Sequence, residues 1–336
     1  MLRWTVFALV SAGITAFVAL LLINGMNDIF HGVGAVGWGL AVVVLLRLTA
    51  LSIAGLGWRR IMGARPLKPA ATYIGLRLLR ESINCLLPVG QVGGDMIGGR
   101  LLARFGVPQA RAAASILVDL LLQASTQGLF ALIGLAVLWQ LEGDSPLLRK
   151  IGSGLIIAVP ALGGFFIAQR LGLFALVDRA LREVARRRGG EGGIEAIDLQ
   201  GALSGLYADP RSLVMAGCIH FLGWLLGTFE IFVVLHQLGK HPSLGEAMVL
   251  ESLGQAVRSA AFAVPGALGV QEGGYILLGA LFALSPRDAL VVSLVKRLPD
   301  LVIGIPGLLI WQGMEAGFLR RRGILTEPRS KGAVDV

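Results

Sequence analysis

The chain has 336 residues, of which 55% are hydrophobic and only 15% are charged, and its mean hydropathy is +0.75. Soluble domains carry about 25% charged residues, so this composition excludes a soluble globular protein and indicates a polytopic membrane protein. The formal net charge of +9 does not indicate a nucleic-acid partner, because the arginines gather at the ends of apolar segments without interleaved aromatic residues. They are interpreted as topology signals and contacts to anionic lipid.

The N-terminal part predicts two membrane spans. Residues 4–25 contain no charged side chain and can cross a hydrocarbon core of about 30 Å, so a first span is favoured over a signal peptide. A second span is expected over residues 36–57, and a basic cluster that contains Arg59 and Lys68 follows it. Basic clusters mark cytoplasmic loops, which places the N-terminus in the cytoplasm. Residues 1–68 are therefore expected to form an N-terminal two-helix unit.

The next segment, residues 70–105, carries several charged residues and breaks at Pro88. Two half-helices in a re-entrant hairpin explain this pattern, because broken backbone at membrane depth must be buried in protein or line a cavity. Full crossings are expected over 112–138 and 151–168. Residues 69–171 thus form a first half whose hairpin is broken at Pro88.

The second half is expected to repeat this plan after a polar cytoplasmic connector over residues 172–210. Residues 211–318 contain a crossing at 213–235, a hairpin at 246–284 broken at Pro265, and a last crossing at 289–311. A cytoplasmic tail, 319–336, follows. The fold class is therefore an all-α polytopic membrane protein with about six full spans and two re-entrant helical hairpins. Three crossings separate the proline breaks, an odd number, so the hairpins face oppositely in an inverted repeat.

The two breaks resemble each other in detail. An offset of 177 residues places Pro88 opposite Pro265 and Asp95 opposite Glu272, with several glycines before each acid. Broken, acid-bearing segments at matching places in two halves indicate a transporter-type site. Two unrelated kinked helices are the alternative.

Ionisable residues at membrane depth are the site candidates, since each costs about 2.5–3.5 kcal/mol to insert. Glycines at the breaks allow the backbone to approach a ligand closely, and the N-termini of the half-helices offer free N–H groups to an anionic head group. Arginine side chains are suited to bidentate contacts with phosphate. A midplane cavity holding Arg80, Asp95, Glu272 and Arg258 is expected. The candidate substrate or translocation residues are Arg80, Glu81, Asn84, Pro88, Gly93, Gly94, Asp95, Arg100, Arg258, Pro265, Gly269, Glu272, Gly273, Gly274, Lys296, Arg297 and Asp300, with Arg47 and Asp119 as further candidates.

Spacing predicts partners for some of these groups. Asp300 lies four residues after Lys296 and three after Arg297, so one intrahelical ion pair is expected. The other base would then pair with Glu272 or Asp95, and a purely structural role for this trio is equally open. His220 is interpreted as a satisfied interior histidine rather than a proton relay.

No metal site, cofactor or catalytic residue is expected, because the sequence contains none of the soluble phosphate-binding, zinc-binding or Cys-x-x-Cys motifs. Cys85 and Cys218 are isolated within apolar runs and are expected as buried free thiols.

Four stretches of the sequence together resemble those of one family. They are 79–88 (LRESINCLLP), 92–95 (VGGD), 265–275 (PGALGVQEGGY) and 294–300 (LVKRLPD). The chain resembles the flippase-like transmembrane region of lysylphosphatidylglycerol synthetases, and within it the branch encoded with hopanoid biosynthesis genes. The resemblance implies lipid translocation between leaflets of the bacterial inner membrane. Lysyl transfer is not expected, because no room is left for an aminoacyl-transfer domain.

The leading hypothesis is an inner-membrane lipid flippase or transporter, not an enzyme, that moves a hopanoid or an anionic phospholipid. A membrane enzyme using Asp95 and Glu272 as acid and base is one alternative. A non-catalytic scaffold for hopanoid biosynthesis is another. The expected partners are membrane lipids, with a homo-oligomer or hopanoid-pathway proteins as further candidates and no nucleic acid. Both termini are expected in the cytoplasm.

Overall fold

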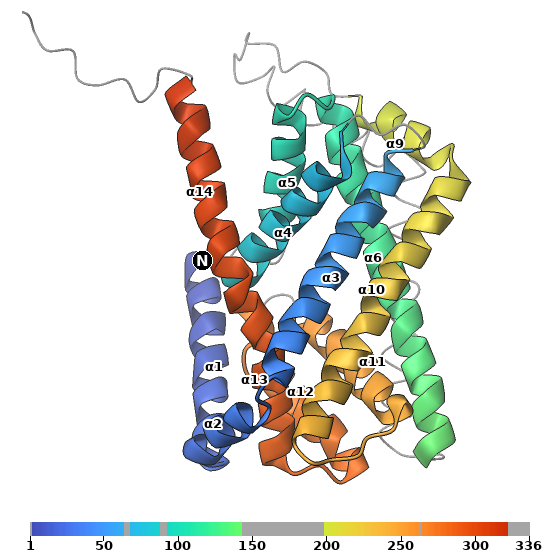
Figure 1. Cartoon of the computed structure of the whole chain (residues 1–336). Helices are drawn as coiled ribbons and strands as arrows, with labels where there is room; N and C mark the ends of the chain where they lie inside the picture. The colour runs from blue at the N-terminus through green and yellow to red at the C-terminus, as the bar shows by residue number, and fades with distance from the viewer. Residues whose placement is uncertain (1, 64–67, 88–92, 143–197, 262–263, 322–336) are drawn as a thin grey trace, which may run out of the picture.

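The computed structural model describes residues 2–63, 68–87, 93–142, 198–261 and 264–321, and every regular element within these ranges is helical (Figure 1). The all-α fold class is therefore confirmed. The crossing predicted at 151–168 and most of the predicted connector lie outside the described residues, and so do Pro88 and the tail from residue 322 onward.

The N-terminal unit contains three helices instead of the two predicted. α1 (Leu2–Ile23) bends by 85° into the short α2 (Met26–Ala35), and Gly25 provides the turn with a φ of +79°. Only glycine adopts this left-handed conformation without steric cost. α3 (Gly39–Ile61) then runs back along the molecule and ends with two arginines, Arg59 and Arg60.

The first hairpin consists of α4 (Ala70–Leu86) and α5 (Gly93–Arg104), which meet near the middle of the molecule. In Figure 1 both helices occupy the upper end, and the long α6 (Gln109–Glu142) then descends from that end. α9 (Leu199–Tyr207) and α10 (Pro210–Gln237) begin at the same end.

The second hairpin approaches from the opposite end, as predicted. α11 (Leu244–Ala260) rises from the lower end, a short 3₁₀ turn (η1, Pro265–Ala267) forms the break, and α12 (Val270–Gly279) descends again (Figure 1). Gly266 and Gly269 have positive φ values of 63° and 77°. The proline followed by these glycines therefore produces the break that the sequence predicted.

The last predicted crossing, 289–311, is interrupted. A second 3₁₀ turn (η2, Ala280–Phe282) precedes α13 (Pro286–Val302), and α14 (Gly304–Arg321) follows after Ile303. The ring of a proline clashes with the carbonyl four residues earlier, so Pro306 explains why α13 ends at Val302.

Within the described ranges, three helices are long and apolar enough to span a membrane, namely α3, α6 and α10. The bent pair α1 and α2 counts as a fourth if it forms one span. The predicted spans at 36–57, 112–138 and 213–235 correspond to the three long helices. The hairpins and the interrupted last crossing are not of this type, because charged residues and breaks divide them.

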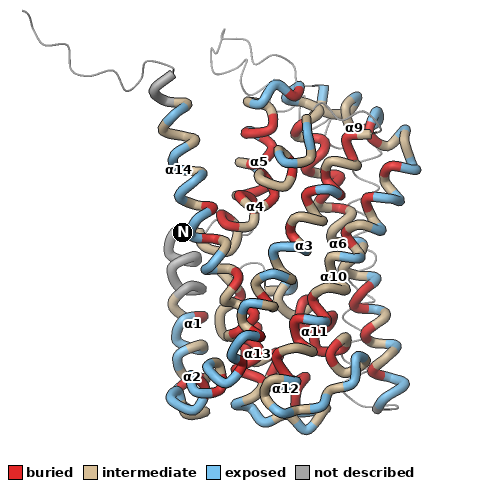
Figure 2. Tube along the Cα trace, in the orientation of Figure 1, coloured by how far each residue is buried: buried red, intermediate tan, exposed pale blue. Residues whose placement is uncertain are grey.

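Each hairpin is buried in its own apolar core. Tyr73 and Leu101 of the first hairpin pack in an upper cluster with Trp58, whereas Leu250 and Leu278 of the second belong to a lower cluster. Figure 2 shows buried segments of α4 and α5 above and of α11, α12 and α13 below. The broken ends of both hairpins thus point toward the middle of the molecule, where the polar side chains gather.

Candidate functional site

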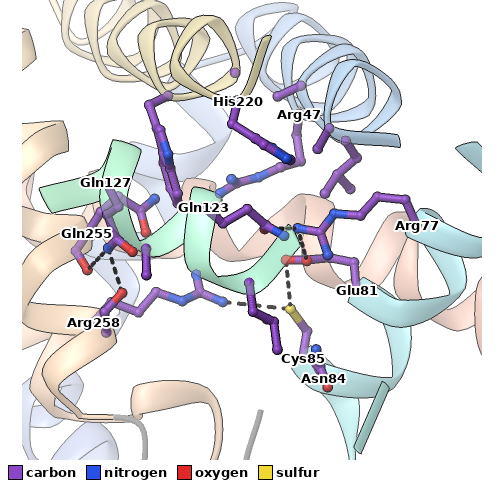
Figure 3. A pocket seen from close by; sticks show the side chains of 18 of the residues that line it. Arg47, Arg77, Glu81, Asn84, Cys85, Gln123, Gln127, His220, Gln255 and Arg258 are labelled. Atoms are coloured by element: carbon purple, nitrogen blue, oxygen red, sulfur yellow. Dashed lines mark hydrogen bonds and ion pairs between the residues drawn. The ribbon is translucent and has the colours of Figure 1, made fainter. Parts of the chain in front are cut away.

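A cavity of about 290 Å³ lies where the two broken hairpins meet. Asn84 and Asp95 from the first hairpin line it together with Gly266 from the second break. Figure 3 shows polar side chains from α3, α4, α6, α10 and α11 around it. This central cavity is lined by the polar residues Arg47, Arg77, Glu81, Asn84, Cys85, Asp95, Gln123, Gln127, His220, Trp224, Gln255, Arg258 and Ser259.

Three arginines on three different helices reach the central cavity: Arg47 on α3, Arg77 on α4 and Arg258 on α11 (Figure 3). Each is held by one acid, at 3.7 Å for Arg47 and Glu230, 3.3 Å for Arg77 and Glu81, and 3.0 Å for Arg258 and Asp300. Each guanidinium group carries five N–H donors, so donors remain for a ligand in the cavity.

The start of α5 is fixed by a hydrogen-bond network around Asp95. Arg80 Nε donates to Asp95 Oδ1 at 2.8 Å, and Asn84 Nδ2 donates to Oδ2 at 3.0 Å. The Gly94 N–H donates to Asn84 Oδ1 at 2.7 Å. A Cβ at Gly94 would collide with the Arg80 carbonyl oxygen, so the close approach of α4 and α5 requires glycine.

Arg80 is fully buried behind the cavity wall, and its contacts extend this hydrogen-bond network to α6 and α10. Its Nη1 lies 2.7 Å from Asp119 Oδ2, and the other carboxylate oxygen of Asp119 lies 3.0 Å from His220 Nε2. Gln123 Nε2 also donates to Asp119 at 2.7 Å, and Arg77 donates to Gln123 at 3.0 Å. We call Arg77, Arg80, Glu81, Asp95, Asp119 and His220 the hairpin charge cluster.

In the second hairpin, Glu272 plays the part that Asp95 plays in the first. It is fully buried, accepts hydrogen bonds from Arg297 Nε at 2.8 Å and Ser293 Oγ at 2.9 Å, and caps α12 by accepting from the Gly269 N–H at 2.7 Å. Arg297 Nη1 also donates to the Gly266 carbonyl at 2.8 Å. The expectation that one base of α13 pairs with Glu272 is therefore confirmed, and Arg297 is that base.

The intrahelical pair predicted for Asp300 is wrong. Lys296 is buried and lies 2.6 Å from both Glu230 of α10 and Glu251 of α11, whereas Asp300 binds Arg258 of α11. Spacing along a helix identifies residues that share a face, but buried charges are satisfied by the acids and bases of neighbouring helices. Those partners are not visible from the sequence of α13 alone.

Of the candidate residues, Arg47, Glu81, Asn84, Asp95 and Arg258 line the central cavity. Arg80 and Glu272, which were expected in it, are instead fully buried behind its wall. The buried layer behind the wall also holds Asp119 and Lys296, and Arg297 binds Glu272 there.

Several other candidates lie elsewhere in the two hairpins. Arg100 is at the far part of α5, where it pairs with Glu315 of α14. Gly93 begins α5, Gly269 precedes α12, and Pro265 begins the 3₁₀ turn at the break. Gly273 and Gly274 lie within α12, with Gly274 close to Val257 of α11.

Sequence reasoning missed Arg77, Gln127, Gln255 and the position of His220 at the cavity. Gln123 and Gln127 are four residues apart on a long apolar helix, a spacing that places both on one face and could have indicated a polar lining. Cys85 and Cys218 are free thiols, as predicted, but neither is buried as expected: Cys85 is half-buried and Cys218 is exposed.

This geometry defines a class, the polytopic α-helical membrane proteins built around two opposed, broken hairpins. Residues 4–307 match the family described as the lysylphosphatidylglycerol synthase TM region, and the chain belongs to that family. Membership implies a membrane protein that acts on lipids. Comparison with curated proteins and with solved structures gives no match.

Proposed function

We propose that this protein is a lipid transporter of the flippase type, which moves the polar head group of a membrane lipid from one leaflet to the other. The observation that carries the proposal is the central cavity. It lies between the tips of two oppositely facing hairpins, and three arginines reach it at membrane depth. Charged groups at this depth are costly and mark substrate pathways.

The cavity chemistry favours a phosphate-bearing head group. Arg47, Arg77 and Arg258 present guanidinium groups from three sides, and guanidinium binds phosphate oxygens in bidentate geometry. The glutamine side chains and Asn84 add donors and acceptors for hydroxyl or amide groups of the same head group. An anionic phospholipid is therefore the proposed substrate, and a hopanoid with a polar side chain is the second candidate.

Alternating access would come from motion of one hairpin unit against the other. Each hairpin packs in a separate apolar core, so each can move as a unit. At the cavity the two halves are linked by hydrogen bonds, such as those from Gln127 Nε2 to Ser259 Oγ at 2.6 Å and to the Gln255 carbonyl at 3.0 Å. A few polar contacts can exchange for contacts to a head group at small net cost.

The enzyme alternative requires Asp95 and Glu272 at one reacting centre. Asp95 lines the cavity, whereas Glu272 is buried and bonded to Arg297, Ser293 and a backbone N–H. This arrangement favours an anchoring role for Glu272. A scaffold would have little use for a charged cavity, so transport is the function that the site supports best.

We further propose the bacterial inner membrane as the location, with both termini in the cytoplasm. Arg59, Arg104 and Arg111 lie at the end of the molecule where α3 ends and α6 begins, which favours that end as the cytoplasmic one. Membrane lipids are the proposed partners, and a homo-oligomer or hopanoid-pathway proteins are further proposals.

Cysteine labelling tests this orientation in a background without Cys85 and Cys218. Cysteines introduced at Lys68 and at Gly239 should react with an impermeant reagent from opposite sides of the membrane. Reaction from the same side would contradict both the orientation and the opposed hairpins.

The transport proposal is tested with purified protein in liposomes. One head-group-labelled anionic phospholipid and one labelled hopanoid are supplied separately, and leaflet exchange and chemical change of each are measured. Exchange of the phospholipid without chemical change supports the proposal. Exchange of the hopanoid alone would favour a hopanoid as the substrate, and chemical change of either lipid would favour the enzyme alternative. If neither lipid is exchanged or changed, the transport proposal is contradicted.

A further inference from the structure

The charges around the central cavity do not balance. Within the part of the chain that the structure describes, the cavity wall and the layer behind it hold six cations and seven carboxylates. The cations are Arg47, Arg77, Arg80, Arg258, Lys296 and Arg297, and the carboxylates are Glu81, Asp95, Asp119, Glu230, Glu251, Glu272 and Asp300. One negative charge is therefore uncompensated at a depth where charge is costly.

The imbalance falls on one cluster. Arg297 with Glu272 and Arg258 with Asp300 are neutral pairs, and Arg47 and Lys296 together balance Glu230 and Glu251. The hairpin charge cluster is what remains, with two arginines against three carboxylates.

His220 is the one other titratable member of the hairpin charge cluster, and it can supply the missing positive charge. Its Nε2 lies 3.0 Å from Asp119 Oδ1, and its side chain is 2% exposed and lines the central cavity. Imidazole changes charge between about pH 5 and 8, the range of ordinary membrane pH gradients. Among the described residues only Nε2 has a hydrogen-bond partner, which leaves Nδ1 as the atom that can accept a proton.

We propose that His220 and Asp119 form a proton-binding site and that lipid transport is coupled to it. A proton from the cavity forms an N–H bond at Nδ1 while the Nε2–H stays hydrogen-bonded to Asp119, and the same proton leaves when the cavity reopens to the other side. The coupling rests on the proposed transport function, whereas the proton site itself rests on the geometry.

The surroundings of His220 favour binding of one proton. Asp119 is the charged group in direct contact, and Arg80 on its far side is already shared with Asp95. The charged groups that face the ring or the same cavity are Asp119 on α6, Arg77, Arg80 and Glu81 on α4, Asp95 on α5, Arg47 on α3 and Arg258 on α11. Lys296 of α13 is taken by Glu230 and Glu251.

A continuous chain of contacts connects the proton site to the first hairpin. From His220 it passes to Asp119 at 3.0 Å, to Arg80 at 2.7 Å and to Asp95 at 2.8 Å, in the first turn of α5. Loss of the proton leaves Asp119 to compete with Asp95 for Arg80, which loosens the hairpin tip. A head group with one negative charge that enters together with one proton also leaves the charge of the cavity unchanged.

Proton binding is measured directly by NMR of the full-length protein in nanodiscs with isotope-labelled histidine. The chain has four histidines, so the signal lost in His220→Gln identifies this ring. We expect the His220 signal to show reversible uptake of one proton as the pH is lowered, and we expect Asp119→Asn to change the pH at which this happens, because the imidazolium loses its carboxylate partner. A ring that keeps one form from pH 5 to 9, or a midpoint that Asp119→Asn leaves in place, overturns the site.

Coupling is measured in liposomes that contain a labelled anionic phospholipid and carry a gradient of one pH unit. With one proton per lipid, the gradient should drive up to a tenfold difference between leaflets, because one pH unit is a tenfold ratio of proton activity. His220→Gln and Asp119→Asn, both first shown to insert and purify like the parent, should lose this response. Movement that ignores the gradient in the parent overturns the coupling alone. No movement at any pH overturns the transport function and the coupling with it.

Discussion

Removing the charge of Lys296 should destabilise the protein more than any other single neutralisation behind the cavity. Its Nζ lies 2.6 Å from both Glu230 and Glu251, and all three side chains are buried. Breaking a buried ion pair on one side costs about 3–5 kcal/mol. Lys296→Met leaves two carboxylates facing Arg47, which lies 3.7 Å from Glu230, so a loss near 5 kcal/mol in the free energy of unfolding is expected.

Double variants show which acid becomes the uncompensated one. Lys296→Met with Glu251→Gln keeps Arg47 and Glu230 as a neutral pair and should recover most of the stability. Lys296→Met with Glu230→Gln should recover less, because Arg47 forms no ion pair with Glu251 among the described contacts. Abundance in membranes and thermal unfolding in detergent measure both effects. A Lys296→Met protein that accumulates and unfolds like the parent would refute the reasoning.

Three further outcomes are expected. Asp300→Ala should lower the abundance of the protein in membranes because it leaves Arg258 unpaired, and the added change Arg258→Met should restore that abundance. Equal abundance of Asp300→Ala and the parent would count against a stabilising ion pair. Gly94→Ala should lower the melting temperature because its Cβ collides with the backbone of α4, whereas Gly75→Ala, with open space around the added Cβ, should be neutral or stabilise by up to about 1 kcal/mol. Arg100→Ala should lower the free energy of unfolding by less than about 1 kcal/mol and leave the transport rate unchanged, because its ion pair with α14 faces solvent. A large transport defect would show instead that Arg100 contributes to the transport site.

The hairpins could be predicted because their signals are local. A proline and several glycines within an apolar segment break a helix wherever the segment lies, and the acid after each break marks the start of the next half-helix. The opposed orientation followed from counting crossings between Pro88 and Pro265. Both features agree with the arrangement of α4 and α5 against α11 and α12.

The partners of the buried charges could not be predicted, because they lie on other helices. Asp300 is within reach of Lys296 by spacing alone, yet it binds Arg258, which is 42 residues away in sequence. The long-range contact between Asp119 and His220 spans 101 residues. Such pairs depend on which helices lie next to each other, and the apolar composition of the helices does not determine that arrangement.

The interruption at Ile303 had a local signal that hydropathy hides. Residues 289–311 are apolar enough on average to suggest one crossing, but Pro306 conflicts sterically with the carbonyl of Val302. The short α2 is a similar case. Its residues fall between the two predicted spans at 4–25 and 36–57, yet they form a helix, and Ile29 is fully buried in the lower core.

The most direct test of the central claim compares two neutralised ion pairs in the liposome assay for anionic phospholipid. Arg258→Gln with Asp300→Asn removes a guanidinium group from the central cavity, whereas Arg100→Gln with Glu315→Gln removes a pair between α5 and α14 outside it. A charge-assisted hydrogen bond is worth about 1.5–3 kcal/mol, so the cavity variant should transport at least about tenfold more slowly while it folds like the parent. The outer variant should transport at the parent rate. Equal transport by both variants would contradict passage of the head group through the central cavity.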